Sequence, residues 1–130
     1  MWPQDLKYSK SHEWARIEGG VVTMGITDFA VKHLSDLVFI ELPEVGEAVK
    51  QGESFAEIES VKAVADVCAA ISGEIVEINN ALDGEIETIS KDCYNAGWIV
   101  KIKMSDPGEA DGLMDVEVYT KYAEAAEEEV

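Results

Sequence analysis

A lysine at position 62 stands in a setting that suits covalent modification. Residues 59–66 read Glu-Ser-Val-Lys-Ala-Val-Ala-Asp and lie between two runs with strand character. The neighbours of Lys62 in this segment are small or apolar, and none of them is basic. If the segment forms a hairpin tip, the amine projects into solvent from a rigid support, where a modifying enzyme can reach it. From spacing alone, an ordinary exposed lysine and a modification site both remain open.

The residue patterns of common enzyme active sites are absent from the chain. It contains no Gly-x-Ser-x-Gly, no P-loop, no Gly-x-Gly-x-x-Gly and no His-Glu-x-x-His sequence. Ser11, His12 and Glu13 are adjacent, but neighbouring residues on a strand point to opposite faces and cannot form a relay. Two histidines, two cysteines and no Cys-x-x-Cys argue against a structural zinc site and a disulfide scaffold.

Short strands at turn-punctuated spacing make up most of the elements that must position Lys62. Residues 14–18 and 21–24 flank Gly19-Gly20, which is typical of a tight hairpin. Strands are also expected at residues 38–42, 54–59, 74–78 and 98–103. This spacing predicts a mainly β fold, a flattened barrel or sandwich of two small antiparallel sheets. The expected core residues are Trp14, Ile26, Phe39, Ile40, Val76, Ile78, Trp98, Val100 and Ile102.

Helices are expected at three places outside the sheets. Thr27 is a suitable N-cap for a short helix over residues 27–36. Asp106 followed by Pro107, and Asp115 further on, predict two C-terminal helical segments within residues 106–127. The acidic end of the chain is expected to fray. We expect one domain over residues 1–130, with its core at about 7–104.

The composition limits the classes of partner. The chain has 130 residues, and 27 Asp+Glu against 10 Lys+Arg give a net charge of −17. Such a charge repels nucleic-acid phosphates and anionic membrane surfaces, so neither is an expected partner. No apolar run approaches a bilayer-spanning length and no secretion signal is visible. We expect a cytoplasmic protein, or a mitochondrial-matrix protein if a transit peptide was removed.

Six segments in collinear order over residues 7–122 resemble the family of glycine cleavage system H proteins and H-protein-like lipoate-binding proteins. The segment around Lys62 resembles the lipoylation motif of that family. The others are residues 11–14 (Ser-His-Glu-Trp), 25–28 (Gly-Ile-Thr-Asp), 39–46, 72–79 and 97–102. A pentapeptide alone is a weak match, whereas six ordered segments are a specific one.

The resemblance implies a carrier and not an enzyme. In this family a lipoyl group is amide-linked to the motif lysine, here Lys62, as N6-lipoyllysine, and the arm extends on the order of 14 Å. The implied role is to shuttle an aminomethyl group and reducing equivalents. The implied partners are a pyridoxal-phosphate glycine decarboxylase, an aminomethyltransferase, dihydrolipoyl dehydrogenase and a lipoate-attaching enzyme. A monomer with transient partners is expected.

The resemblance also implies a cleft in which the arm docks. Its positions correspond to Ser11, Glu13, His33 and Asp66, while Glu59 is implied in recognition by the attaching enzyme. A cationic amine on sulfur needs acceptors and acidic groups when it is buried. Each of these residues can also be interpreted without a functional role, as an exposed acid, a turn serine or a surface histidine.

Departures from the family pattern keep alternatives open. Cys68 and Cys93 occupy atypical positions, and small core residues are the simplest interpretation of both. One alternative is an H-protein-like lipoate-binding protein that carries sulfur to a heterodisulfide-reductase-like complex in bacterial sulfur oxidation. A biotin carrier is a second alternative, which Val61 and Ala63 in place of flanking methionines disfavour. A purely structural interaction module is the third.

Overall fold

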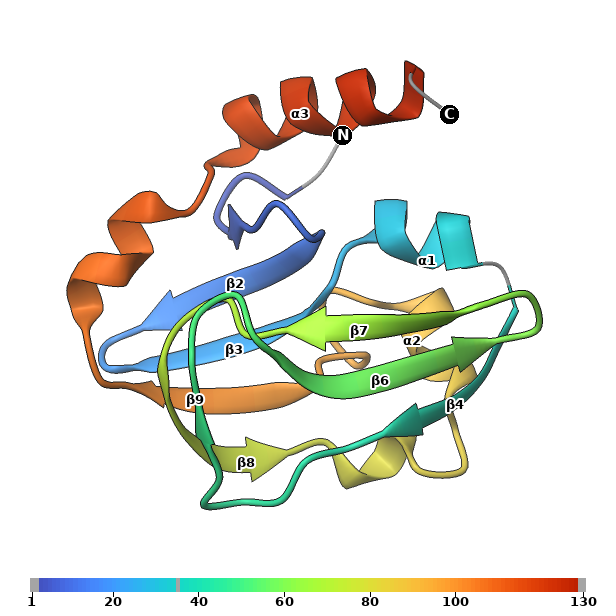
Figure 1. The fold of residues 1–130 in the computed structure, drawn as a ribbon, viewed down its shortest axis with the longest axis horizontal. Helices are drawn as coiled ribbons and strands as arrows, with labels where there is room; N and C mark the ends of the chain where they lie inside the picture. The colour runs from blue at the N-terminus through green and yellow to red at the C-terminus, as the bar shows by residue number, and fades with distance from the viewer. Residues whose placement is uncertain (1–2, 35, 129–130) are drawn as a thin grey trace.

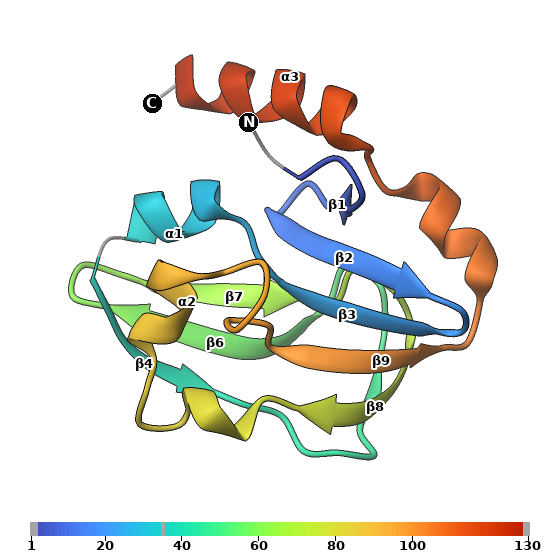
Figure 2. The same cartoon turned by 180° about the vertical axis from the view of Figure 1, so that it is seen from behind.

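Two antiparallel sheets form the frame of the protein (Figures 1 and 2). The computed structural model describes residues 3–34 and 36–128. A six-stranded sheet has the order β1-β2-β3-β9-β8-β5, and a three-stranded sheet has the order β4-β6-β7. The strands are β1 (Lys7–Tyr8), β2 (Glu13–Glu18), β3 (Val21–Ile26), β4 (Leu37–Glu41), β5 (Ala48–Val49), β6 (Ser54–Ser60), β7 (Val64–Cys68), β8 (Gly73–Ile78) and β9 (Val100–Met104).

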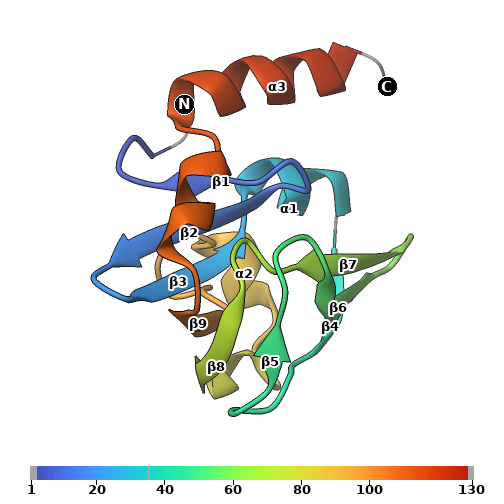
Figure 3. The same cartoon turned by 60° about the vertical axis from the view of Figure 1, so that its left-hand side comes forward.

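The main core fills the space between the two sheets. Seen from the side in Figure 3, β4, β6 and β7 lie on the opposite side of the molecule from β2, β3 and β9. Ile58 of the smaller sheet and Met24 and Ile102 of the larger sheet are fully buried in one cluster. Side chains alternate along each strand, so each sheet turns one apolar face inward. The expected mainly β sandwich of two antiparallel sheets is confirmed, although one sheet has six strands and is not small.

The helical elements cover the outside of this frame. They are α1 (Asp28–Leu34), the 3-10 segment η1 (Asn80–Leu82), α2 (Glu87–Lys91), the 3-10 segment η2 (Pro107–Gly112) and α3 (Val116–Glu128). Figures 1 and 2 show α3 lying across the N-terminal strands, beyond α1. Tyr119 and Ala123 of α3 pack with Tyr8, Trp14 and Phe29 in a second apolar cluster. Within the described residues, no helix combines the length and apolar character needed to cross a membrane.

The helix caps follow the local sequence. Thr27 Oγ1 accepts a hydrogen bond from the Ala30 amide at 3.3 Å, as expected for the N-cap of α1. Asp106 accepts from the Gly108 amide at 3.0 Å, and Asp115 accepts from the Val118 amide at 3.0 Å. The segment after Asp106 is a 3-10 helix and not an α-helix.

Four of the expected core residues are less buried than the sequence predicts. Phe39 is 53% exposed because it neighbours Ile40, which takes the inward position on β4. Val76 is 39% exposed because a register shift in the pairing of β8 with β9 turns Ile75 inward in its place. Ile78 and Trp98 are half-buried. The prediction was therefore wrong for Phe39 and Val76. It gave no range for β7 and missed the short elements β1, β5, η1 and α2, whose sequences carry no clear periodic signal.

Candidate functional site

The turn that carries Lys62 joins β6 to β7 at one end of the smaller sheet (Figure 1). Ser60 organises this turn. Its amide donates to the Ala63 carbonyl at 2.8 Å, and its hydroxyl oxygen accepts from the Ala63 amide at 3.1 Å. The Val61 amide donates to the Asp36 carbonyl at 3.0 Å, which ties the turn to the segment after α1. The backbone around Lys62 is therefore held from two sides.

The side chain of Lys62 is exposed at this turn. Val61 and Val64 beside it are 66% and 60% exposed, so the lysine stands among accessible apolar side chains. In the part of the chain that the structure describes, the amine has no ion-pair partner. An amine in this position is open to an enzyme that approaches from solvent.

A cavity of about 370 Å³ lies between α1 and the β6–β7 hairpin. Most of its lining is apolar and comes from Ile26, Phe29, Ala30, Leu34, Ile58, Ala65 and Val67. Its polar lining residues are Ser11, His12, His33 and Asp66. A cavity of this kind suits a hydrocarbon chain that ends in a polar group.

Three of the four expected cleft residues line this cavity, and the fourth lies behind it. Ser11 and His33 contribute from the turn before β2 and from α1, and Asp66 contributes from the edge strand β7. The Asp66 carboxylate accepts a hydrogen bond from Ser54 Oγ at 3.2 Å. Glu13 does not line the cavity, but its carboxylate accepts the hydroxyl hydrogen of Ser11 and so reaches the cavity through that residue.

Glu13 is a buried acid held by several donors. Its residue is 1% exposed. The carboxylate accepts hydrogen bonds from Ser9 Oγ, from Ser11 Oγ and, at 3.1 Å, from the Cys68 amide. Burial raises the pKa of Glu13, and the hydrogen bonds from Ser11 and Ser9 oppose that rise. The carboxylate thus joins the start of β2 to the end of β7 behind the cavity.

His12 is a cavity residue that the sequence reasoning missed. Among the described residues, His12 is the non-glycine residue with a positive φ, at 69°. The ring stacks on Phe29 with centroids 4.3 Å apart, and Nδ1 lies 2.8 Å from the Tyr119 hydroxyl. Burial, with a smaller contribution from His33, lowers the pKa of His12. In the sequence, only the adjacency of His12 to Ser11 and Glu13 could have indicated that it lies at the cavity.

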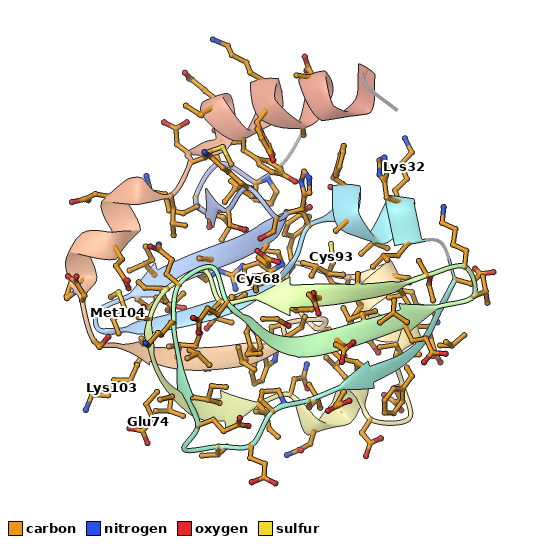
Figure 4. The ribbon with its side chains drawn as sticks, viewed as in Figure 1. Lys32, Cys68, Glu74, Cys93, Lys103 and Met104 are labelled. Carbon is orange, nitrogen blue, oxygen red and sulfur yellow. The ribbon has the colours of Figure 1, made fainter. Side chains whose placement is uncertain are left out.

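Cys68 lies at the C-terminal end of β7 (Figure 4). Its amide donates to the Glu13 carboxylate. The thiol is half-buried, and burial followed by the charge of Glu13 raises its pKa. Cys93 is buried, and burial raises its pKa to about 12. Neither thiol is paired in a disulfide. Cys93 is the small core residue that the sequence suggests, while Cys68 is only half-buried.

The distance from the turn to the cavity is within reach of a long side-chain modification. Asp66 follows Lys62 by four residues, so their backbones lie at most about 13 Å apart, the length of four fully extended residues. Glu59 lies elsewhere, on the outer face of β6, where it pairs with Phe39 on one side and with Val64 on the other. The structure therefore separates Glu59 from the cavity and brings Ser11, His33 and Asp66 together at it.

Comparison with known proteins decides the family. Residues 6–126 match the family described as "Glycine cleavage H-protein". The chain belongs to the glycine cleavage H-protein family. A glycine cleavage system H protein from Anaeromyxobacter sp. (strain K) is 47% identical over 125 residues, which cover 96% of this chain and 98% of that protein. A probable glycine cleavage system H protein from Aeropyrum pernix is 53% identical over 118 residues, covering 91% of this chain and 82% of that protein.

A solved structure agrees with the family assignment. The crystal structure of a glycine cleavage system H protein from Mycobacterium marinum has a TM-score of 0.84 and 43% identity to this chain. The match covers 96% of this chain and 98% of that chain. Membership of the H-protein family confirms the expected role as a carrier protein in glycine cleavage. None of these findings supports the sulfur-oxidation alternative.

Proposed function

We propose that Lys62 is the attachment site of a lipoyl group in this member of the H-protein family. The observation that carries the proposal is an exposed lysine in a braced turn between β6 and β7, two strands that also line a mostly apolar cavity. Its amine is accessible for acylation, and the backbone of Lys62 lies within about 13 Å of Asp66, which lines the cavity. When attached to Lys62, the dithiolane of the lipoyl group would supply a sulfur that accepts an aminomethyl group or a pair of electrons.

The cavity fits such a group chemically. Its apolar wall, which includes Phe29, Ile58 and Val67, accommodates a hydrocarbon arm and excludes water. Ser11 and His33 offer polar atoms, and Asp66 offers a negative charge at the rim. Glu13 orients the Ser11 hydroxyl by accepting its hydrogen. Together these residues bind a cationic amine, orient it and protect it from hydrolysis.

Glu59 serves a different step in this proposal. It is exposed on the outer face of β6, three residues before Lys62 and away from the cavity lining. An acid at that place is available to the lipoate-attaching enzyme when it approaches the turn. We therefore assign Glu59 to recognition during lipoylation and not to docking of the arm.

The partners follow from the carrier role. We propose that the arm of Lys62 visits a pyridoxal-phosphate glycine decarboxylase, an aminomethyltransferase and dihydrolipoyl dehydrogenase in turn. The net charge of −17 favours encounter with basic surfaces around the active sites of these enzymes. A monomer is expected, because each partner must reach the same turn. A location in the cytoplasm or the mitochondrial matrix stays a prediction.

The decisive experiment is lipoylation in vitro, read by intact-mass spectrometry. We expect a mass increase of one lipoyl group on the wild-type chain and none on the Lys62→Arg variant. Lys50→Arg, at an exposed lysine next to another turn, is the matched control and should be lipoylated normally. The lipoylated chain should then support glycine–bicarbonate exchange with the decarboxylase. A biotinyl adduct, no adduct, or lipoylation of the Lys62→Arg variant would reject the proposal.

A further inference from the structure

Both histidines of the chain stack on Phe29 at the wall of the cavity. The ring centroid of His12 lies 4.3 Å from that of Phe29, and the ring centroid of His33 lies at the same distance from it. All three residues line the cavity. A neutral imidazole has one nitrogen that donates and one that accepts, so the position of the hydrogen decides what each ring can bind.

His33 presents an acceptor to its surroundings. Its Nδ1 lies 2.9 Å from the backbone carbonyl oxygen of Phe29, one turn earlier in α1. A carbonyl oxygen can only accept a hydrogen bond, so Nδ1 of His33 carries the ring hydrogen. In the neutral ring, Nε2 is then left as an acceptor.

His12 has the opposite arrangement, because a chain of hydroxyl groups ends at its ring. Thr27 is fully buried, and its Oγ1 already accepts from the Ala30 amide. A buried hydroxyl hydrogen needs an acceptor, and the Tyr119 oxygen lies 2.9 Å from Thr27 Oγ1. The Tyr119 hydroxyl then donates to Nδ1 of His12 at 2.8 Å. Burial lowers the pKa of His12, so the ring is neutral at pH 7 and carries its hydrogen on Nε2.

The Nε2 atoms of both rings are unused within the protein. Among residues 3–34 and 36–128, the hydrogen bonds of the two side chains are those of their Nδ1 atoms. In the same residues no buried side-chain nitrogen lacks a partner, so each Nε2 keeps an open side. His12 also holds a φ of 69°, which costs free energy at a residue other than glycine. Strained backbone of this kind gathers at functional sites.

We infer that His12 binds a sulfur atom of the docked arm through a hydrogen bond from Nε2–H, and that Tyr119 is the positioning residue that fixes this tautomer. The inference rests on the proposed attachment of the lipoyl group to Lys62. The far end of a loaded arm offers an ammonium group and sulfur. The ammonium group only donates, so it pairs with Ser11 and Asp66 and not with an N–H group. Sulfur accepts, most strongly as a thiolate.

The place of His12 along the cavity favours the far end of the arm. The Lys62 turn is tied to Asp36, just beyond the C-terminal end of α1. His12 instead packs on Phe29, near the N-terminal end of the same helix. The amide oxygen of the arm is bound next to the Lys62 nitrogen and stays near the turn. An arm that runs along α1 therefore reaches His12 with its sulfur atoms and not with its amide.

The tautomers can be measured in the unlipoylated chain by nitrogen-15 NMR of the histidine rings at pH 8. We expect the hydrogen on Nε2 in His12 and on Nδ1 in His33, so each ring is a reference for the other. Tyr119→Phe removes the donor to Nδ1 of His12 and should leave a mixture of both tautomers in that ring. Tyr94→Phe is the matched control and should change neither ring, because it removes a hydroxyl that donates to Asp28 and keeps that of Tyr119.

The hydrogen bond to sulfur can be measured in the lipoylated chain with its arm reduced. An N–H donor stabilises the thiolate relative to the thiol. His12→Phe keeps an aromatic ring beside Phe29 and removes the donor. The fraction of arm thiolate at pH 7.5, read by ultraviolet absorbance after subtraction of the unlipoylated chain, should fall about tenfold. Tyr119→Phe should lower this fraction about twofold. The acids at and behind the cavity, Asp66 and Glu13, stay the same in both variants.

The possible outcomes separate this inference from the carrier role. A hydrogen on Nδ1 of His12 in the wild type overturns the inference. An unchanged thiolate fraction in fully lipoylated His12→Phe also overturns it and leaves the carrier role intact. If His12→Phe does not fold, Tyr119→Phe decides: mixed tautomers with an unchanged thiolate fraction overturn the bond to sulfur. A wild-type chain that takes up no lipoyl group overturns the carrier role itself.

Discussion

Replacing Glu13 by alanine tests whether this buried acid holds the cavity together. The substitution removes an acceptor shared by the Ser9 hydroxyl, the Ser11 hydroxyl and the Cys68 amide. Ser11 is exposed and Ser9 is half-buried, so both hydroxyls can turn toward water. The Cys68 amide is fixed in β7 and loses its partner. The cost therefore falls mainly on the end of β7 that borders the cavity.

The size of the effect follows from three contributions. An amide left without its hydrogen-bond partner costs about 2 kcal/mol, and the one lost methylene group costs about 0.8 kcal/mol. Removing the carboxylate also removes the cost of burying a charge, which stabilises the variant by about 1.5 kcal/mol. The net loss in the free energy of unfolding is about 1.3 kcal/mol, which lowers the melting temperature by about 5 °C for a chain of this size.

The effect should depend on pH in a defined direction. Burial raises the pKa of Glu13 in the folded protein above its ordinary value of 4.5. A group with a raised folded pKa stabilises the fold below its unfolded pKa, and this stability is lost as pH rises through the folded pKa. The wild type should therefore gain stability over Glu13→Ala as the pH falls from 7.5 through that folded pKa.

Urea unfolding at several pH values measures this difference directly. Glu18→Ala, at an exposed acid on the same strand, should change stability by less than about 0.5 kcal/mol at every pH. In the lipoylated and loaded carrier, Glu13→Ala should speed the release of ammonia about tenfold, because Ser11 loses its orienting partner. Lipoylation itself should be unaffected. A variant as stable as wild type, with unchanged release of ammonia, would refute the role given to Glu13.

Three further outcomes are expected. Tyr119→Phe removes a buried hydroxyl that lies 2.9 Å from Thr27 Oγ1. It should lower the free energy of unfolding, measured by urea titration, by about 1.5 kcal/mol. An unchanged free energy of unfolding would contradict a stabilising hydrogen bond at this place. Gly73→Ala places a Cβ 2.0 Å from a carbonyl oxygen of β9 and should cost about 3 kcal/mol, which a thermal melt equal to wild type would disprove. In the folded protein at pH 8, iodoacetamide should alkylate Cys68 well before Cys93, because Cys93 is buried with a pKa of about 12. Equal rates of alkylation at the two thiols, measured by peptide mass spectrometry, would contradict this order. In urea both thiols should react.

The hairpin turns and the helix starts are features that the local sequence predicts. Gly19-Gly20 predicts the turn between β2 and β3, and Gly19 has the positive φ of 64° that such a turn uses. Thr27 and Asp115 predict the starts of α1 and α3 because a cap acts on amides two or three residues away. Interactions over so few residues are determined by the local sequence.

The errors have a different origin. Alternation places Val76 inward, but a register shift against β9 turns Ile75 inward in its place. A register shift depends on the partner strand, which lies more than twenty residues away in the sequence. Phe39 is as apolar as Ile40, and only the packing of β4 on the core decides which of the two is buried.

The sequence by itself determined the class of elements, the turn that presents Lys62, and the excess of acid that selects basic partners. The tertiary structure alone decided that the turn before β2, helix α1 and strand β7 enclose one cavity. It alone also placed His12 against Phe29 and Tyr119. The physical reason is that caps and turns act through a few bonds, whereas a cavity and a stack of rings depend on distant segments whose positions are fixed only when the two sheets and the helices pack.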